Sequence, residues 1–221
     1  TGFRDYARPA GPVRQAPPNP NGRWFHMRIA VSACALLLLA ASAHAYKVPG
    51  EVSTEVVPGH SVGPVSLSSD RSELAEVFGE PALSDTMIHM GEGTYRTGTR
   101  ALTGTTMALS VVWAEESMQR PERITALGSA WTAPGGVTTG MTLREVADRV
   151  GEFRLTGFGW DYGGTADMAE TDLEGLLLRF RLPEDRAVTG VLSGDSWFAS
   201  DHPAMVEANP VLASIMVTDS E

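Results

Sequence analysis

The sequence predicts an α+β fold with two tandem repeats. Each repeat is a strand, a short helix and an antiparallel β-meander, and the helices pack on one face of the sheet or sheets. Three observations lead to this fold class. A segment at residues 63–79 recurs without a gap at residues 135–151. Each copy has the cap, the apolar spacing and the terminal glycine of a short helix. Each copy is also followed by stretches whose apolar residues alternate as they do in strands.

The helix of each copy is expected to begin after Asp70 or Thr142. These side chains can accept hydrogen bonds from free amides of the first helical turn. A glutamate follows each cap by three residues, which is the spacing of a capping box. Gly79 and Gly151 stand where a left-handed C′ residue would close each helix. Helices this short are unstable alone, so we expect their apolar stripes to lie against a sheet.

Strands are expected on both sides of these helices, where apolar residues alternate with polar ones. In the first half they are residues 64–67, 86–90, 106–115 and 123–129. In the second half they are residues 137–139, 153–162, 176–182, 187–193 and 211–217. A short helical turn before the last strand is expected to be capped by Ser200 or Asp201, with Pro203 near its start, and to end at Asn209.

Four segments are predicted along the chain. Residues 1–26 are rich in Pro, Gly, Asn and Arg and are interpreted as a non-native upstream or disordered segment. Residues 27–45 have the charged start, apolar run and small-residue end of a signal peptide. Residues 46–130 form the first repeat, and residues 131–221 form the second with a C-terminal extension. The two repeats could share one sheet or form separate domains.

The predicted leader directs the protein to the periplasm or out of the cell, with cleavage near Ala45 and a competing site at Ala43. After cleavage we expect no integral membrane span, because the apolar run of the leader is short even for an anchor. Cys34 is the only cysteine, so residues 46–221 can form no disulfide. They carry 12 basic and 26 acidic side chains, a formal net charge of −14. Such a chain repels phosphate backbones, which argues against nucleic-acid binding.

No catalytic residue, metal site or cofactor is predicted. The histidines after residue 45 have no second ligand at zinc spacing; they are His60, His89 and His202. The acidic window at residues 167–174 lacks the spacing of a calcium loop and is interpreted as a solvated loop. The glycines do not precede a Lys-Ser or Lys-Thr pair, so they form no phosphate loop.

The paired segments, with Gly140-Met141-Thr142 before the second helix, resemble a group of largely uncharacterised bacterial periplasmic proteins with duplicated Gly-Met-Thr, helix and glycine units. More remotely they are similar to the module of small outer-membrane-assembly lipoproteins (SmpA/OmlA-like) and of tandem-module β-lactamase inhibitor proteins. The resemblance covers most of residues 58–182. It implies an interaction or envelope-maintenance module rather than an enzyme.

We predict that the contact surface lies in what the two copies do not share. Its candidate residues are Phe158, Trp160, Asp161, Tyr162 and Trp197. Trp and Tyr are frequent interface anchors, and alternation would place the first three aromatic rings on one strand face. The alternative is that this face packs under the second helix. The predicted function is non-enzymatic binding of an envelope protein or cell-wall component. The alternative is a hydrolase whose acids, such as Asp161 and Glu174, meet in a cleft between the repeats.

Overall fold

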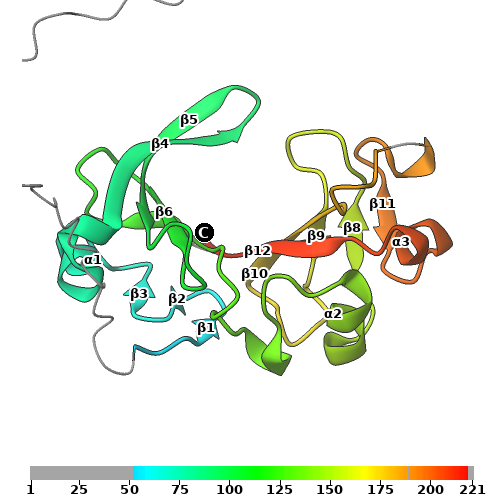
Figure 1. The fold of residues 1–221 in the computed structure, drawn as a ribbon, viewed down its shortest axis with the longest axis horizontal. Helices are drawn as coiled ribbons and strands as arrows, with labels where there is room; N and C mark the ends of the chain where they lie inside the picture. Colours follow the sequence, from blue (N-terminus) through cyan, green and yellow to red (C-terminus); the bar gives the residue numbers. More distant parts are fainter. Residues whose placement is uncertain (1–51, 189, 219–221) are drawn as a thin grey trace, which may run out of the picture. The chain divides into compact units, whose positions relative to one another are not determined.

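The computed structural model describes residues 52–188 and 190–218, which form a mixed α+β unit dominated by one large antiparallel sheet (Figure 1). The nine strands of this sheet lie in the order β11-β8-β9-β10-β12-β7-β6-β5-β4. Their bounds are β4 Leu83–Gly91, β5 Thr94–Ala101, β6 Leu109–Trp113, β7 Pro121–Ala126, β8 Arg154–Thr156, β9 Thr165–Asp167, β10 Leu176–Arg181, β11 Trp197–Ala199 and β12 Val211–Thr218. The predicted segments 1–26 and 27–45 lie outside the described residues.

Smaller elements complete the unit. A three-stranded sheet consists of β1 Val56–Val57, β2 Ser61–Val62 and β3 Val65–Ser66. The α-helices of the described residues are α1 Arg71–Phe78, α2 Leu143–Val150 and α3 Pro203–Ala208. Three short 3₁₀ turns are η1 Glu80–Ala82, η2 Pro134–Gly136 and η3 Gly190–Leu192. Within the described residues, no helix is both long and apolar enough to cross a bilayer.

The last strand joins the two halves of the chain. Strand β12 pairs with β10 of the second half on one side and with β7 of the first half on the other. Its residue Ile215 lies opposite both Leu178 and Ala126, and all three are fully buried. The two halves therefore share one continuous sheet, and the C-terminal segment supplies its middle strand.

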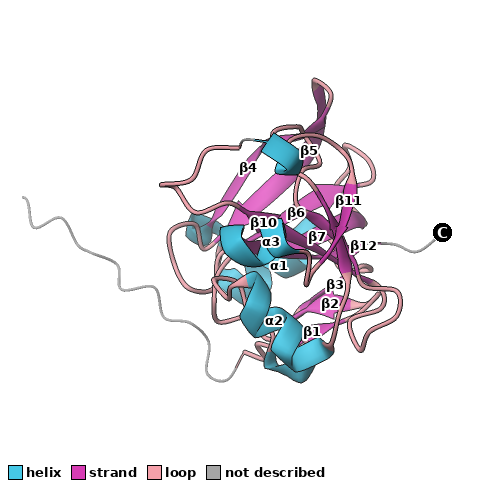
Figure 2. Cartoon of the chain, turned by 90° about the vertical axis from the view of Figure 1, so that its right-hand side faces the viewer, coloured by secondary structure: helices cyan, strands magenta, loops and turns pink. Residues whose placement is uncertain are grey.

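The predicted N-caps of α1 and α2 are confirmed, and of these two helices α2 shows the complete capping box that was predicted for both. The Asp70 carboxylate accepts a hydrogen bond from the Glu73 amide at 2.9 Å. Thr142 and Glu145 form a complete capping box, in which the Glu145 carboxylate accepts from the Thr142 amide at 2.8 Å. Each helix ends at the predicted glycine with positive φ, but the predicted left-handed conformation is wrong, because ψ is 141° at Gly79 and −171° at Gly151. Buried apolar side chains of both helices, including Phe78 and Val146, belong to the hydrophobic core. Figure 2 shows α2 and α3 next to each other.

Alternation along the central strands separates a core face from a second face. Ile124, Ile215 and Leu178 point into the core. Their strand neighbours Arg123 and Arg179 therefore point to the opposite face. Residues directly opposite each other in a sheet point to the same face, so Val112, the partner of Arg123, lies there too. This second face carries the candidate site described below.

Several predicted strands are wrong. Residues 187–193 do not form a strand; part of the segment is the 3₁₀ turn η3, and the strand that pairs here is β11. Residues 137–139 form only a bridge at Val137. The strand predicted over residues 153–162 ends at Thr156, because the chain turns away at Gly157. The cap of α3 is His202, whose Nδ1 accepts from the Ala204 amide, rather than Ser200 or Asp201. The predicted end of α3 at Asn209 is confirmed.

Candidate functional site

The loop of residues 157–164 connects β8 to β9 and contains four of the predicted site residues. Phe158 anchors it, with a side chain that is only 5 % exposed and a backbone that bridges to Ser193. Gly164 closes it with φ of 75°, and its carbonyl accepts from the Phe180 amide at 2.8 Å. A Cβ at this position would lie 2.1 Å from the Phe180 carbonyl oxygen. Only glycine therefore lets the loop end this close to β10.

Two aromatic side chains of this loop remain partly exposed. Trp160 and Tyr162 keep 39 % and 38 % of their surface, and their rings meet edge to face with centroids 5.4 Å apart. The Trp160 indole donates to the Gly157 carbonyl at 3.3 Å. The single strand face predicted for the three aromatic residues is wrong. Because the chain leaves the sheet at Gly157, Phe158 enters the core whereas the other two rings face outward.

The loop touches the tip of the β4–β5 hairpin, which lies about 70 residues earlier in the chain. The Asp161 carboxylate accepts a hydrogen bond from the backbone amide of Glu92. The Tyr162 ring lies over Gly91, so close that a Cβ built there would be 2.6 Å from the phenol oxygen. We call this contact, between residues 90–94 and residues 157–164, the clasp. Figure 1 shows the hairpin reaching toward the loop above the central strands.

Two arginines from the second face of the sheet support the clasp. Arg179 of β10 donates to the carbonyl of Asp161 and, at 3.3 Å, to that of Gly163. Arg123 of β7 donates to the thioether sulfur of Met90 at 3.1 Å. Burial lowers the pKa of the Arg123 guanidinium, and the nearby charge of Arg179 lowers it further. Glu122 and Tyr162 act on this pKa in the opposite direction but do not outweigh the burial.

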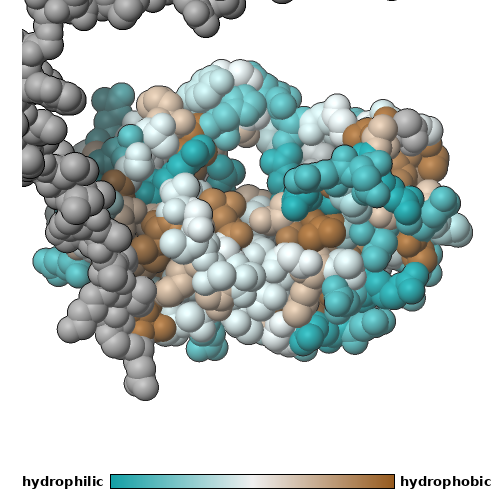
Figure 3. Space-filling view, viewed as in Figure 1, coloured by the Kyte–Doolittle hydropathy of each residue, from teal (hydrophilic) through white to brown (hydrophobic). Residues whose placement is uncertain are grey.

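The clasp spans an opening in the molecular surface. Figure 3 shows this opening between the β4–β5 hairpin, the second half of the chain and the central strands. Polar groups and half-exposed rings therefore lie beside a space that a ligand segment could enter. The arrangement can hold a partner by apolar contact and by hydrogen bonds, whereas it presents no nucleophile beside a base.

The structure does not bring every predicted residue to the clasp. Trp197 lies on β11, where its ring stands 5.8 Å from the Arg154 guanidinium carbon, and it makes none of the clasp contacts given above. Glu174 lies in the turn before β10, and the next residue, Gly175, accepts from the Gly59 amide. Asp161 instead meets Arg179, which lies three residues, about 10 Å, along β10 from the end of the strand that follows Glu174.

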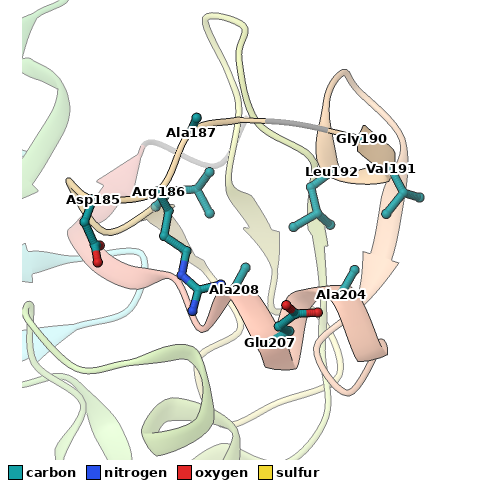
Figure 4. Close-up of a pocket in the computed structure, with 10 residues that line it drawn as sticks. Asp185, Arg186, Ala187, Gly190, Val191, Leu192, Ala204, Glu207 and Ala208 are labelled. Carbon is teal, nitrogen blue, oxygen red and sulfur yellow. The ribbon is translucent and has the colours of Figure 1, made fainter.

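Further hollows lie away from the clasp. One of about 510 Å³ lies between α3 and the segment before β11, and the side chains of Arg186 and Glu207 project into it (Figure 4). A more apolar one, of about 500 Å³, is bordered by Leu83, Leu102 and Met107. Within residues 52–188 and 190–218, no three acidic, histidine or cysteine side chains gather to hold a metal ion.

Sequence reasoning missed the hairpin and arginine half of the site. Gly91-Glu92-Gly93 has the composition of a tight turn, and Arg179 interrupts a leucine run. Neither pattern predicts which distant residues the segment will contact. The contacts depend on strand order, which local patterns do not reveal.

No protein-family model matches the chain, and no curated protein matches it. Among solved structures it is similar to the uncharacterized protein yfeY from Escherichia coli, with a TM-score of 0.47 and 17% sequence identity. The match covers 73% of this chain and 98% of that chain.

Proposed function

We propose that the protein is a non-enzymatic binding protein of the cell envelope. In this proposal, it works in the periplasm or outside the cell after cleavage near Ala45. It engages an envelope protein or a cell-wall component through the clasp. We also propose that its two halves are tandem copies of one unit, with helices on the core face of the sheet. The matching caps of α1 and α2 and the strands after each helix support that duplication.

The observation that carries the binding proposal is the fixed exposure of Trp160 and Tyr162. Rings that lie half in solvent lose part of the gain from burial, which is about 25 cal/mol per Å² of apolar surface. The hydrogen bond from Trp160 to Gly157 nevertheless holds the first ring in place. Asp161, the residue between the two rings in the sequence, holds the loop by its hydrogen bond from the Glu92 amide. An aromatic surface ordered before binding costs less entropy when a partner covers it. Such rings are typical anchors of protein interfaces.

Binding is supported over hydrolysis by the positions of the acids. Asp161 uses its carboxylate to hold the hairpin tip, and Glu174 lies in another part of the unit. General acid and base catalysis requires two groups within reach of one substrate. The clasp offers a surface of rings and backbone groups instead.

The test is recovery of partners from an envelope extract and from purified cell wall, with the full chain carrying a C-terminal tag. Truncation of an interface anchor typically costs 2 kcal/mol or more, so Trp160→Ala should lower recovery of a specific partner at least about tenfold. Trp197→Ala is the matched control, because this ring is also exposed but lies on β11. Equal recovery by wild type and Trp160→Ala, or equal losses in both variants, would refute the clasp as the binding surface.

A further inference from the structure

A cation that supports the clasp, Arg123, has hydrogen-bonding groups that are incompletely used. The Nε atom of Arg123 is shielded from solvent and has no hydrogen-bond partner. Another nitrogen of the same guanidinium donates to the Met90 sulfur, which is a weak acceptor. Ion pairs elsewhere in the described part of the chain join Arg71 to Glu80 and Asp85, and Arg96 to Glu122. None of them neutralises Arg123.

A second cation lies close to the first. Arg179 is near enough for its charge to act on Arg123, and its guanidinium donates hydrogen bonds to the neutral carbonyls of Asp161 and Gly163. Burying a charge without an opposite charge costs several kcal/mol unless hydrogen bonds compensate for it. Glu122 also acts on the charge of Arg123, but its carboxylate pairs with Arg96 at 3.3 Å. Within the described residues neither guanidinium forms an ion pair of its own, so an added anion would stabilise this arrangement.

We propose that Arg123 and Arg179 bind an oxyanion, a carboxylate or a phosphate, carried by the ligand that the clasp takes up. This inference rests on the binding function proposed above and names the chemistry of that same site. Guanidinium groups bind both oxyanions through paired, charge-assisted hydrogen bonds. An opening lies between the β4–β5 hairpin, the second half of the chain and the central strands, and the two arginines belong to two of these strands, β7 and β10 (Figure 3).

The charge of the remaining surface restricts the kind of anion. Residues 46–221 carry a formal net charge of −14, so an extended polyanion would be repelled over most of its length. A single oxyanion meets only the local pair of cations. The rings of Trp160 and Tyr162 beside it add apolar contact, so the ligand combines one acidic group with an apolar part.

The experiment measures thermal unfolding of the full chain in chloride, inorganic phosphate and acetate at matched ionic strength. The phosphate and acetate arms separate the two sources of the oxyanion. At an anion concentration about tenfold above its Kd, linkage predicts that the midpoint of the wild type rises by about 3–6 °C. Arg123→Gln should lose this rise. Arg100→Gln is the matched control and should retain it, because Arg100 is exposed on β5 away from the clasp.

Phosphate also stabilises proteins without specific binding, but that effect would be equal in all variants. Arg123→Met preserves the apolar stem of the side chain and guards against a packing artefact. In chloride its thermal unfolding midpoint should be close to that of the wild type. In phosphate or acetate this midpoint should not rise. A rise of equal size in Arg123→Gln, or no rise in either anion at about 50 mM, would overturn the oxyanion site. Partner recovery that depends on Trp160 would then still support the proposed function.

Discussion

Gly91 offers a way to displace the aromatic loop without altering a single aromatic residue. Its φ is 111°, and a Cβ added there would lie 2.6 Å from the Tyr162 phenol oxygen and 2.7 Å from Cζ. Gly93 lies two residues away at the same hairpin tip with φ of 72°, and a Cβ there would meet nothing within 4 Å. Gly91→Ala therefore combines backbone strain with a steric clash, whereas Gly93→Ala has the strain alone.

The expected magnitude follows from these two contributions. Positive φ costs an alanine about 1–2 kcal/mol, and this cost applies to both variants. Overpacking adds about 1–3 kcal/mol when the neighbours are fixed. Tyr162 is 38 % exposed and can swing toward solvent, so we expect the lower end, about 1 kcal/mol. The swing would also pull Asp161 from the Glu92 amide and open the clasp.

The assay is a double-mutant cycle measured by urea unfolding. Wild type, Gly91→Ala, Tyr162→Ala and the double variant give a coupling energy from which the backbone strain cancels. We expect the alanine at position 91 to be about 1 kcal/mol less costly when Tyr162 is absent. The same cycle built on Gly93→Ala should give a coupling near zero. Partner recovery should fall in Gly91→Ala and persist in Gly93→Ala.

A coupling energy indistinguishable from zero at Gly91 would mean that the Tyr162 ring does not lie over the hairpin tip in solution. The clasp would then be absent, and with it the physical basis for the fixed aromatic surface. Similar coupling at Gly93 would refute the reasoning in another way, because the effect would reflect general loosening of the hairpin.

Three further predictions concern stability. Burial alone would raise the pKa of Asp85, but hydrogen bonds from Arg71 and Thr99 outweigh it and hold the pKa below its ordinary value. The resulting stabilisation is complete above the unfolded-state pKa near 3.9 and is lost as pH falls through the lower folded-state value. Because the carboxylate is 42 % exposed, Asp85→Asn should cost only about 1 kcal/mol in urea unfolding at neutral pH, and wild type and variant should converge in acid. Thr142→Ala should cost about 1 kcal/mol and Thr142→Ser much less, as measured by thermal unfolding; equal losses would exclude the cap as the cause. Leu178→Ala should cost about 2–5 kcal/mol in urea unfolding, whereas Leu177→Ala, at a 40 % exposed position, should cost under about 1 kcal/mol; comparable costs would contradict the assignment of faces.

The sequence was most informative where structure depends on near neighbours. The caps at Asp70 and Thr142 and the terminal glycines of both helices were predicted correctly, because each uses groups within a few residues. The strand at β10 was also predicted, since its apolar and polar residues alternate clearly. The error at residues 187–193 arose because a segment with valine and leucine resembles a strand whether or not an edge is free to pair with it.

The middle of the sheet lay beyond local patterns. The segment that became β12 was expected as a last strand, but nothing in its residues says that it lies between β7 and β10. That position depends on two earlier strands whose edges both remain unpaired until the chain is nearly complete. A strand in the middle of the sheet is covered on both faces, and Val211–Thr218 has buried side chains on both, at Ile215 and at Met216. An apolar run without strict alternation is consistent with a central strand, yet it fits a buried helix segment as well.

The candidate site was half predictable for the same reason. Exposed tryptophan and tyrosine in a glycine-rich loop identify a possible anchor, and Trp160 and Tyr162 were selected on that ground. The groups that hold the surrounding segments come from three other strands or turns: the Glu92 amide bonds Asp161, Arg179 bonds the Gly163 carbonyl, and Arg123 bonds the Met90 sulfur. The strand order brings those groups together: insertion of β12 sets β10 and β7 on either side of one strand, about 10 Å apart. The arginines that project from them lie opposite Ser214 and Thr218 of β12, and Arg179 is near enough for its charge to act on Arg123. A site of this kind is a property of the assembled sheet, and the strongest sequence signal for it is a charged residue in an otherwise apolar strand. Arg179 in β10 is such a residue, whereas Arg123 follows Glu122 in the more polar strand β7. The unpaired Nε of Arg123 nevertheless makes it the position where the proposed chemistry is most directly tested.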